Sequence, residues 1–479
     1  MRDFRQGRVT PASLSDYLAP SNSVQHCLNV NFDTIVGSAV VRPGTTTTGT
    51  VASSREPLGL TEYVGKGGTP NYMMAVFKGA SNATAYYYDG TWHATNKTAL
   101  SNTAKNRFAT LGGSNFMTNG TDGMFDTPQG TTYGTTNSIT TVVPSLVYRY
   151  VARLLASGWS TYPSRVYFSS IVDSASSPFI TWNTNASTGD WIDINPDDGG
   201  YITAFSESST FLLVFKNNGM YRLDAMNKST DPQNIFNVGA VSQEAVVACQ
   251  GVVYFFSGTD IRQTDGGFPQ QISRAGVQDI IDAIPQASWA SVAAGTDGLN
   301  VYFDVGTVTL GANTDNPTTI TNCELKFSPR DQSWSVHSRA SRYQFFTLYT
   351  DTNGRLMRGA DTGGLVQTIN LGTTDNTAAI NYQLETQDME FGNRGHLKSI
   401  ADKITAFTKN GNDSSLIMTV DGEPKAVDIE LTSRVNYSNP VTFSGHFFTV
   451  KWYGVSTGTA PVFEGFQFEN VTDQGSTNK

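Results

Sequence analysis

Residues 211–223 read Phe211-Leu-Leu-Val-Phe-Lys-Asn-Asn-Gly-Met-Tyr-Arg-Leu223, which is a strand, a polar turn and a second strand. Aromatic and β-branched residues favour strands, and Asn and Gly supply the backbone conformations of tight turns. The unit recurs along the chain, with aromatic markers 39, 52, 47, 41, 47 and 43 residues apart at Phe77, Phe116, Phe168, Phe215, Phe256, Phe303 and Phe346. Repeats of about 40–50 residues with several strands each are typical of propeller blades. The sequence therefore predicts an all-β fold with a β-propeller of about six or seven blades.

The composition agrees with short strands joined by tight turns. Of 479 residues, 38% are hydrophobic and only 15% charged, with 45 glycines. One segment, Ser273–Ile284, has the spacing of a helix behind Ser273 as N-cap. Its apolar residues at positions i, i+3, i+4 and i+7 are Val277, Ile280, Ile281 and Ile284.

Three domains are expected. Residues 1–49 form an N-terminal segment in which Gln25–Arg42 gives a strand to the propeller, residues 50–370 form the propeller itself, and residues 378–479 form a C-terminal β-sandwich. The boundary at residue 378 rests on strands with alternating apolar residues every ten or so positions, which is typical of sandwiches.

Three polar stretches are expected to lie between the strands as a loop, an insertion and a linker. Thr45–Ser54 predicts a surface loop after the stop Arg42-Pro43-Gly44, since proline cannot extend a strand ladder. Thr127–Thr141, rich in Thr, Gly and Asn, predicts an exposed insertion, and Leu371–Thr377 predicts a polar linker.

Charge and cysteine usage exclude several classes of protein. The net charge is −9 and no basic run occurs, so a surface that grips nucleic acid is not expected. No apolar stretch has the length of a signal peptide or a membrane span, and the three cysteines, Cys27, Cys249 and Cys323, are widely spaced. We expect synthesis in a reducing cytoplasm, without disulfides and without membrane insertion.

The sequence contains no motif that is typical of an enzyme site. No phosphate-binding loop occurs, and no two of the five histidines (His26, His93, His337, His396 and His446) are spaced as zinc ligands. Asp197–Gly200, Asp297-Gly298 and Asp351–Gly354 are better interpreted as turns than as calcium loops, because a loop needs several converging oxygens. We therefore expect no catalytic, cofactor-binding or metal-binding residues, and no enzyme.

Aromatic residues on the strands allow a second interpretation. Tyr86–Tyr88, Trp92, Trp182 and Trp334 suit packing between neighbouring sheets, although such rings also stack on sugars. The repeated turn of sialidase-type propellers has only faint counterparts, at Asn185–Trp191 and Asp331–Trp334.

Three stretches resemble the tail nozzle, or packaged-DNA-stabilisation (tail tubular), proteins of short-tailed bacteriophages. The first is Asn29–Gly44, with Asn-Val-x-Phe-Asp, a glycine turn and Arg-Pro-Gly. The second is Val147–Ser170, where Val151-Ala-Arg153 precedes the strand Arg165–Ser169. In the third, Gly239–Ile284, the run Gly239-Ala-Val-Ser-Gln-Glu-Ala precedes Val253–Ile261 and the expected helix.

The resemblance implies a structural virion protein with no catalytic residues. It implies a homo-oligomeric ring, typically a hexamer, below the portal and its adaptor ring and in contact with other tail proteins such as fibres or spikes. The ring would extend and close the DNA channel until ejection, with genomic DNA passing through the lumen without tight binding. Two alternatives stay open, namely a carbohydrate-binding or carbohydrate-cleaving host-recognition propeller and a monomeric scaffold that binds protein partners.

Overall fold

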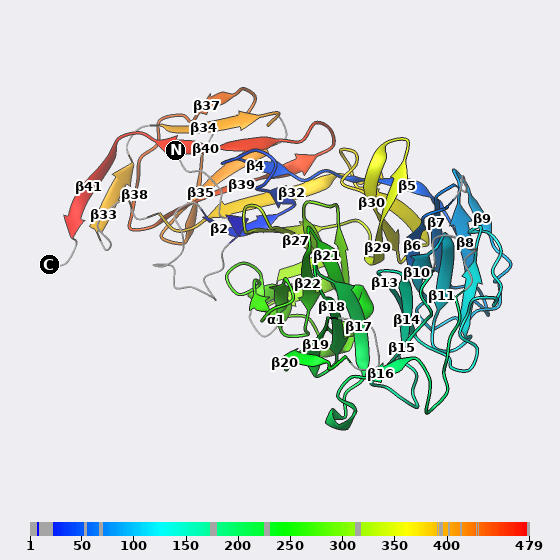
Figure 1. Cartoon of the computed structure of the whole chain (residues 1–479). Coiled ribbons are helices and arrows are strands. Elements are labelled where there is room, and N and C mark those ends of the chain that lie inside the picture. Colours follow the sequence, from blue (N-terminus) through cyan, green and yellow to red (C-terminus); the bar gives the residue numbers. More distant parts are fainter. Residues whose placement is uncertain are drawn as a thin grey trace.

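The computed structural model of the chain describes residues 7–8, 23–51, 55–66, 70–172, 180–224, 230–311, 318–389, 391, 396–400, 403–411, 414–427, 429 and 431–476. Seven small sheets form a propeller, and larger sheets form a sandwich at its side (Figure 1). The chain is therefore all-β, with a seven-bladed propeller and a sandwich.

Blades 1 to 6 are antiparallel meanders of consecutive strands. Blade 1 holds β6 (Pro57–Tyr63), β7 (Tyr72–Phe77), β8 (Thr84–Tyr88) and β9 (Trp92–Ala94). Blade 2 holds β10 (Arg107–Leu111), β11 (Ser114–Thr118) and β12 (Met124–Thr127). Blade 3 holds β13 (Leu146–Tyr150), β14 (Arg153–Ser157), β15 (Arg165–Phe168) and β16 (Trp191–Asp193).

The next three blades repeat this order. Blade 4 holds β17 (Ile202–Glu207), β18 (Leu212–Lys216), β19 (Gly219–Leu223) and β20 (Gln233–Phe236). Blade 5 holds β21 (Val246–Cys249), β22 (Val252–Phe256), β23 (Ile261–Thr264) and β24 (Gln270–Gln271). Blade 6 holds β25 (Ala293–Thr296), β26 (Val301–Leu310), β27 (Thr318–Ser328) and β28 (Ser333–Ser338).

Blade 7 joins distant parts of the chain. Its strands β29 (Tyr343–Asp351), β30 (Gly354–Asp361) and β31 (Leu365–Ile369) are completed by β5 (Thr45–Thr50), which pairs antiparallel with β31. The expectation that Thr45–Ser54 is a loop was wrong for residues 45–50. Threonine is β-branched, so a Thr-rich run forms a strand readily when an open strand edge is available.

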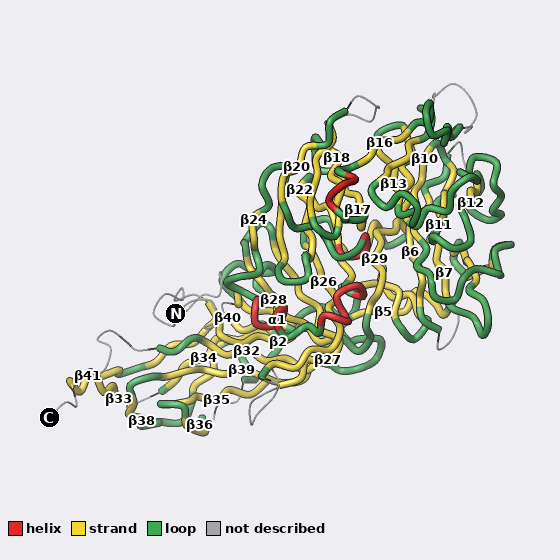
Figure 2. The backbone as a smooth tube through the Cα atoms, turned by 90° about the horizontal axis from the view of Figure 1, so that it is seen from below, coloured by secondary structure: helices red, strands yellow, loops and turns green. Residues whose placement is uncertain are grey.

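The blades are arranged around an axis. The first strand of each blade contacts the first strand of the next, from β6 through β10, β13, β17, β21 and β25 to β29, and β29 contacts β6. In Figure 2 the first strands β6, β13, β17 and β29 lie near the middle of the propeller. The contacts between first strands therefore run through all seven blades and lead back from blade 7 to blade 1.

The sandwich has two main sheets and a small third one. One sheet orders β1 (Gly7–Arg8), β2 (Ser23–Leu28), β32 (Ile380–Thr386), β39 (Phe448–Ser456), β35 (Ser414–Val420) and β36 (Glu423–Ala426). The second orders β3 (Val30–Asn31), β4 (Ala39–Val41), β40 (Val462–Phe468), β34 (Ile404–Lys409) and β37 (Val435–Tyr437). The third orders β38 (Phe443–Gly445), β33 (His396–Ile400) and β41 (Val471–Ser476).

The segment Gln25–Arg42 belongs to this sandwich and not to the propeller, so that expectation was wrong. β2 pairs with β32, and β4 pairs with β40. The alternation of apolar residues shows that one face of such a strand is buried, but it does not specify which sheet buries it. The break at Pro43-Gly44 divides the segment into sandwich strands before it and the propeller strand β5 after it.

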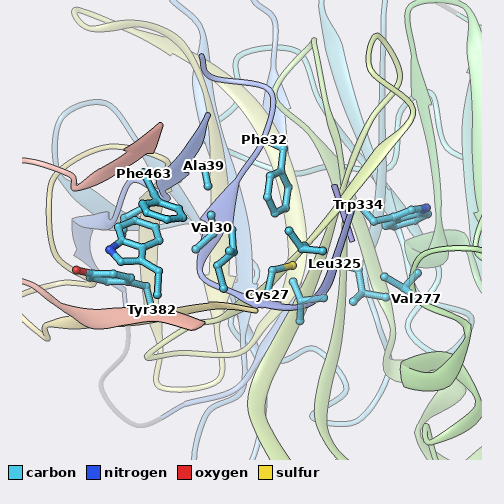
Figure 3. Packing of buried hydrophobic residues seen from close by; sticks show 14 of the residues in the cluster. Cys27, Val30, Phe32, Ala39, Val277, Leu325, Trp334, Tyr382 and Phe463 are labelled. Carbon is cyan, nitrogen blue, oxygen red and sulfur yellow. The ribbon is translucent and has the colours of Figure 1, made fainter. Parts of the chain in front are cut away.

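A continuous core joins the sandwich to blade 6. Val30, Phe32 and Ala39 lie between Tyr382 and Phe463 on the sandwich side and the propeller residues Leu325, Trp334 and Val277 (Figure 3). The outer strand β28 contacts β1, β2 and β3, and the backbone N–H of Asn29 donates to Val336 O at 2.8 Å. The N-terminal strands therefore cover the outer edge of blade 6, which would otherwise be open to pairing with other chains.

The predicted helix is shorter than expected. α1 spans only Gln278–Asp282 and starts after Val277, without a side-chain cap. The Ser273 hydroxyl instead donates to the side chain of Gln278 at 2.7 Å and accepts the backbone N–H of Ile261 at 3.2 Å. The four apolar residues of the pattern are all buried, so the periodicity identified the buried face correctly.

The segment expected to be an exposed insertion and the segment expected to be a polar linker both contain buried groups. Within Thr127–Thr141, Tyr133 and Ile139 are buried in the core, and the carboxylate of Asp126 accepts hydrogen bonds from Asn137 and Ser138. Within Leu371–Thr377, Asp375 is buried. A few buried residues, Tyr133 and Ile139 in the first segment and Asp375 in the second, therefore fix the positions of these otherwise polar segments.

Candidate functional site

A small cavity lies on the axis of the propeller. It has a volume of about 210 Å³ and lies among residues of the first strands, including Arg107, Phe108, Tyr148 and Phe345. Pockets that hold a drug-sized ligand measure about 300–1,000 Å³. A cavity of this volume is too small to hold a nucleic-acid duplex.

One carboxylate ties opposite sides of the ring together beside this cavity. Glu244 precedes β21, and its Oε1 accepts Arg107 Nε at 2.9 Å while its Oε2 accepts Arg107 Nη2 and Lys105 Nζ, each at 3.1 Å. Lys105 Nζ also donates to Ala290 O at 2.8 Å. Burial alone would raise the pKa of Glu244, but the charges of Arg107 and Lys105 and their hydrogen bonds lower it to about 2.

A larger cavity opens at the same end of the axis. Its volume is about 490 Å³, and its walls come from residues just before the first strands of five blades, among them Lys105, Ser145, Tyr201, Ser242 and Ala290. The segment between β14 and β15 adds Trp159 to the wall. Because every contributing segment leads into a first strand or joins two strands of one blade at this end, the cavity is the mouth of the propeller axis.

A second group of buried polar and charged residues holds the sandwich to the propeller. We call it the seam cluster, and it consists of Asn29, Arg42, Glu324, Arg339 and Asp375. Arg42 Nη1 and Nη2 donate to Asp375 at 2.8 and 2.5 Å, and Arg42 Nε donates to Asn29 Oδ1 at 2.7 Å. Burial would raise the pKa of Asp375, but the hydrogen bonds and charge of Arg42 lower it. The first residue of the Arg-Pro-Gly motif is thus part of a buried ion pair.

The other half of the seam cluster surrounds Glu324. Arg339 Nη2 and Nε donate to Glu324 Oε1 at 2.7 and 3.0 Å, and His337 Nδ1 lies 2.9 Å from the same oxygen. Burial opposes ionisation of Glu324, yet Arg339 and His337 lower its pKa to about 2. Burial also lowers the pKa of His337 to about 3, so its imidazole is neutral at pH 7.

The acidic segments weighed as calcium loops form turns. Asp297 Oδ1 accepts the backbone N–H groups of Leu299 and Asn300 at 2.9 and 2.7 Å, and Asp351 Oδ1 accepts that of Asn353 at 2.7 Å. Asp198 accepts the N–H of Gly200 and pairs with Lys216. Within the described ranges, no group of three or more His, Cys, Asp or Glu residues is arranged to hold a metal ion.

Histidines and cysteines serve local structure. His93 lies 3.1 Å from Asp89, His396 lies 3.0 Å from Asp473, and His446 lies 3.4 Å from Asp421. All three cysteines are buried, and no disulfide links any of the described residues. None of the described helices has the length and apolar character that a membrane crossing requires.

The aromatic residues singled out above are spread over separate blades. Trp92 lies 5.1 Å from the ring of Tyr88, Trp334 lies 4.8 Å from that of Phe327, and Trp182 Nε1 donates to Asn137 O. The mouth of the axis instead holds Trp159, which the sequence analysis did not single out. Only its proximity to Pro163 and Tyr162 in a polar turn set it apart in the sequence.

The comparisons found likenesses of fold only. No protein-family model matches the chain, and no curated protein matches it. Solved structures similar to it include BamB from Moraxella catarrhalis, at 8% identity and a TM-score of 0.39, covering 71% of this chain and 93% of that one. YCF48 from Cyanidioschyzon merolae matches at 12% identity and 0.37, covering 67% and 97%, and BBS1N in complex with ARL6DN at 11% and 0.38, covering 70% and 99%.

Proposed function

We propose that this protein is a structural subunit of a phage tail nozzle and not an enzyme. It assembles into a homo-oligomeric ring of six copies that extends the DNA channel below the portal and adaptor, closes it, and opens for genome ejection. Its place is the virion tail, and its partners are the adaptor ring and tail fibres or spikes.

The observation that carries the proposal is the position of two motif residues in the seam cluster. Asn29 and Arg42 begin and nearly end the stretch that resembles nozzle proteins, and both hydrogen-bond across the boundary between sandwich and propeller, Asn29 Oδ1 to Ser338 N and Arg42 to Ser338 O. A subunit of a DNA conduit must keep its shape while the genome moves past it. A buried, hydrogen-bonded junction gives the two domains a fixed geometry.

The contact between opposite blades decides where a channel would run. Because Glu244 and Arg107 meet across the propeller axis beside a cavity of only about 210 Å³, a DNA duplex has no path through a single subunit. The lumen of the proposed ring therefore lies between copies. Heterologous contacts that close by rotation produce such rings.

The net negative charge of the chain favours the passage of DNA without tight binding. The net charge is −9, and several basic residues are already engaged, with Arg107 paired to Glu244 and Arg165 to Asp193. Arg149 and Arg153 donate to backbone carbonyls of their own blade. The carbonyls do not cancel the charges of Arg149 and Arg153, so the repulsion of a polyanion rests on the net negative charge of the whole chain.

Two measurements on the purified chain test the proposal. Mass photometry, alone and with the adaptor protein of the same phage, should give a species six times the mass of one chain. Titration with duplex DNA at low salt should give no binding in the micromolar range or tighter, although low salt favours electrostatic binding most.

Either of two results would refute the nozzle function. A chain that stays monomeric with its adaptor present would favour the scaffold alternative. Micromolar or tighter DNA binding that weakens steeply with salt would indicate a true DNA-binding protein.

A further inference from the structure

The mouth cavity combines a mainly apolar wall with positive charge. Its volume of about 490 Å³ falls within the range of about 300–1,000 Å³ that small-molecule pockets occupy. Its apolar surface includes Trp159, Pro163 and Val241. The charged residues that line it are Lys105 and Arg107, and none of the described residues in its wall is acidic. Such a wall suits a ligand that has an apolar body and a negatively charged group.

The two cations outnumber the carboxylate that they share. Glu244 lines the smaller cavity on the axis and not the mouth cavity, and its lowered pKa of about 2 keeps it ionised at neutral pH. One negative charge therefore meets two positive charges, which leaves a local surplus of positive charge. The side chains of Lys105 and Arg107 are 28% and 18% exposed, so both keep surface that an anion in the cavity can contact.

Both cations also keep N–H groups that they can donate. The ammonium of Lys105 has three N–H groups and uses two of them, on Glu244 Oε2 at 3.1 Å and on Ala290 O at 2.8 Å. The guanidinium of Arg107 has five N–H groups and uses two on Glu244 and one on Ser145 O. A carboxylate in the cavity can accept the remaining N–H groups while Glu244 stays in place, and such hydrogen bonds between ions are strong.

Trp159 provides a fixed aromatic surface in the same wall. Its ring lies edge-to-face with Tyr162 at 5.3 Å and 6.5 Å from the ring of Tyr167. Tyr162 in turn is covered by the guanidinium of Arg165 at 4.0 Å, and Arg165 is held by Asp193. An immobilised ring loses little conformational entropy when a ligand stacks on it, and a flat aromatic ligand makes the largest contact with such a ring.

We propose that the mouth cavity binds a small aromatic carboxylate, whose ring stacks on Trp159 and whose carboxylate pairs with Lys105 and Arg107. The net charge of the whole chain is −9, so the attraction of this anion comes from the local surplus of positive charge and not from the field of the protein as a whole. The site lies within one chain and needs no second copy, so it is independent of the nozzle function proposed above.

The test is a calorimetric titration of the whole chain with three probes of nearly equal size and shape. They are 2-naphthoate, which is an anion, 2-naphthamide, which is neutral, and 2-naphthylmethylamine, which is a cation at pH 7. We expect saturable binding of 2-naphthoate with a Kd of about 1 mM or tighter. The amide and the amine should each bind at least about tenfold more weakly, because neither carries the charge that the two cations attract.

Two variants separate the charged part of the site from the aromatic part. Lys105→Met keeps most of the length of the side chain and removes its charge, so it should weaken the binding of 2-naphthoate by about tenfold and leave that of 2-naphthamide unchanged. Trp159→Leu removes the aromatic surface and keeps much of the bulk, so it should weaken the binding of both probes by a similar factor.

Lys78→Met is the matched control. The side chain of Lys78 is 32% exposed, close to that of Lys105, and it also pairs with one glutamate, but it does not line the cavity. Both lysine variants change the net charge equally, and only Lys105→Met should lose affinity, with melting curves confirming that both are folded. The proposal is overturned if 2-naphthoate does not bind, if the amide or the amine binds as tightly, or if the two lysine variants bind 2-naphthoate equally well.

Discussion

Glu244 is a single carboxylate whose charge bridges blades 2 and 5. Its side chain is 6% exposed, and its partner Arg107 is 137 positions away in the sequence. We predict that Glu244→Gln lowers the free energy of unfolding at pH 7 by about 3 kcal/mol, because two partly buried cations, Lys105 and Arg107, lose their counter-charge. Urea denaturation followed by intrinsic fluorescence measures this loss.

The pH dependence of that loss follows from the lowered pKa. The folded pKa of about 2 lies below the unfolded value of 4.5, so the stabilisation is complete above pH 4.5 and disappears as the pH falls towards 2. At pH 3 the difference between the unmodified chain and Glu244→Gln should be about 2 kcal/mol smaller than at pH 7. Glu56→Gln, which breaks the exposed pair with Lys78, should cost less than about 1 kcal/mol at either pH.

Arg42 and Asp375 form the ion pair of the seam cluster, with side chains 0% and 5% exposed. We predict that Arg42→Met and Asp375→Asn each destabilise the chain by about 3–5 kcal/mol, because each leaves a buried charge unpaired. The double variant should lose about 2 kcal/mol less than the sum of the single losses. Strictly additive losses would show that the two residues act independently.

For single residues, the sequence predicted few of the contacts at the mouth of the propeller axis and in the seam cluster. Arg42 was noted only as part of a strand-ending motif, and its partner Asp375 is 333 positions away. Residues this far apart meet only after both domains have folded, and neither spacing nor composition records the encounter. The turns at Asp297 and Asp351 were predictable because their partners are two or three residues away.

At the scale of elements, Gly239 shows how closely the connection between blades 4 and 5 follows blade 4. A Cβ atom placed on Gly239 would lie 1.6 Å from Lys216 O and 2.7 Å from Gly219 O, both backbone atoms. Gly239→Ala should therefore cost about 3 kcal/mol or more, since the connection has to move away from the sheet. The midpoint of thermal unfolding reports the loss.

Gly458→Ala serves as the comparison, because a Cβ atom there meets nothing within 4 Å. We expect it to change the stability by no more than about 0.5 kcal/mol. Equal effects of the two substitutions would show that the loss reflects glycine's flexibility rather than the close approach.

The spacing of the aromatic markers predicted the length of the repeat, but it did not predict on which strand of each blade the markers lie. Phe77, Phe116, Phe215, Phe256 and Phe303 all lie on second strands of their blades. Phe168 lies on the third strand of blade 3 and Phe346 on the first strand of blade 7, which explains part of the unevenness in the spacing. Aromatic residues pack equally well on any strand of a blade, so their position within it is not fixed by the repeat.

At the scale of the whole molecule, propeller and sandwich share one core. Val30 and Phe32 from the sandwich side pack in the same cluster as Leu325 and Trp334 from blade 6. Because neither domain is complete without the other's residues, we predict that both unfold in a single transition. Calorimetry should give one peak, with fluorescence and circular dichroism midpoints that coincide.

Two separated peaks would contradict this, and so would a sandwich that melts while the propeller keeps its β-sheet signal. The Arg42→Met variant adds a further check. If the seam cluster couples the domains, weakening it should lower the midpoint of the one transition and broaden it.

The position of β5 also governs the order of events while the chain is being made. Thr45–Thr50 emerges from the ribosome early, but its partner β31, at Leu365–Ile369, is synthesised more than 300 residues later. At about 5–20 residues per second, this strand waits on the order of tens of seconds for its partner. During that time its unpaired edge is exposed to other nascent chains, so we expect the yield of native protein to depend on translation speed and on chaperones that cover this segment.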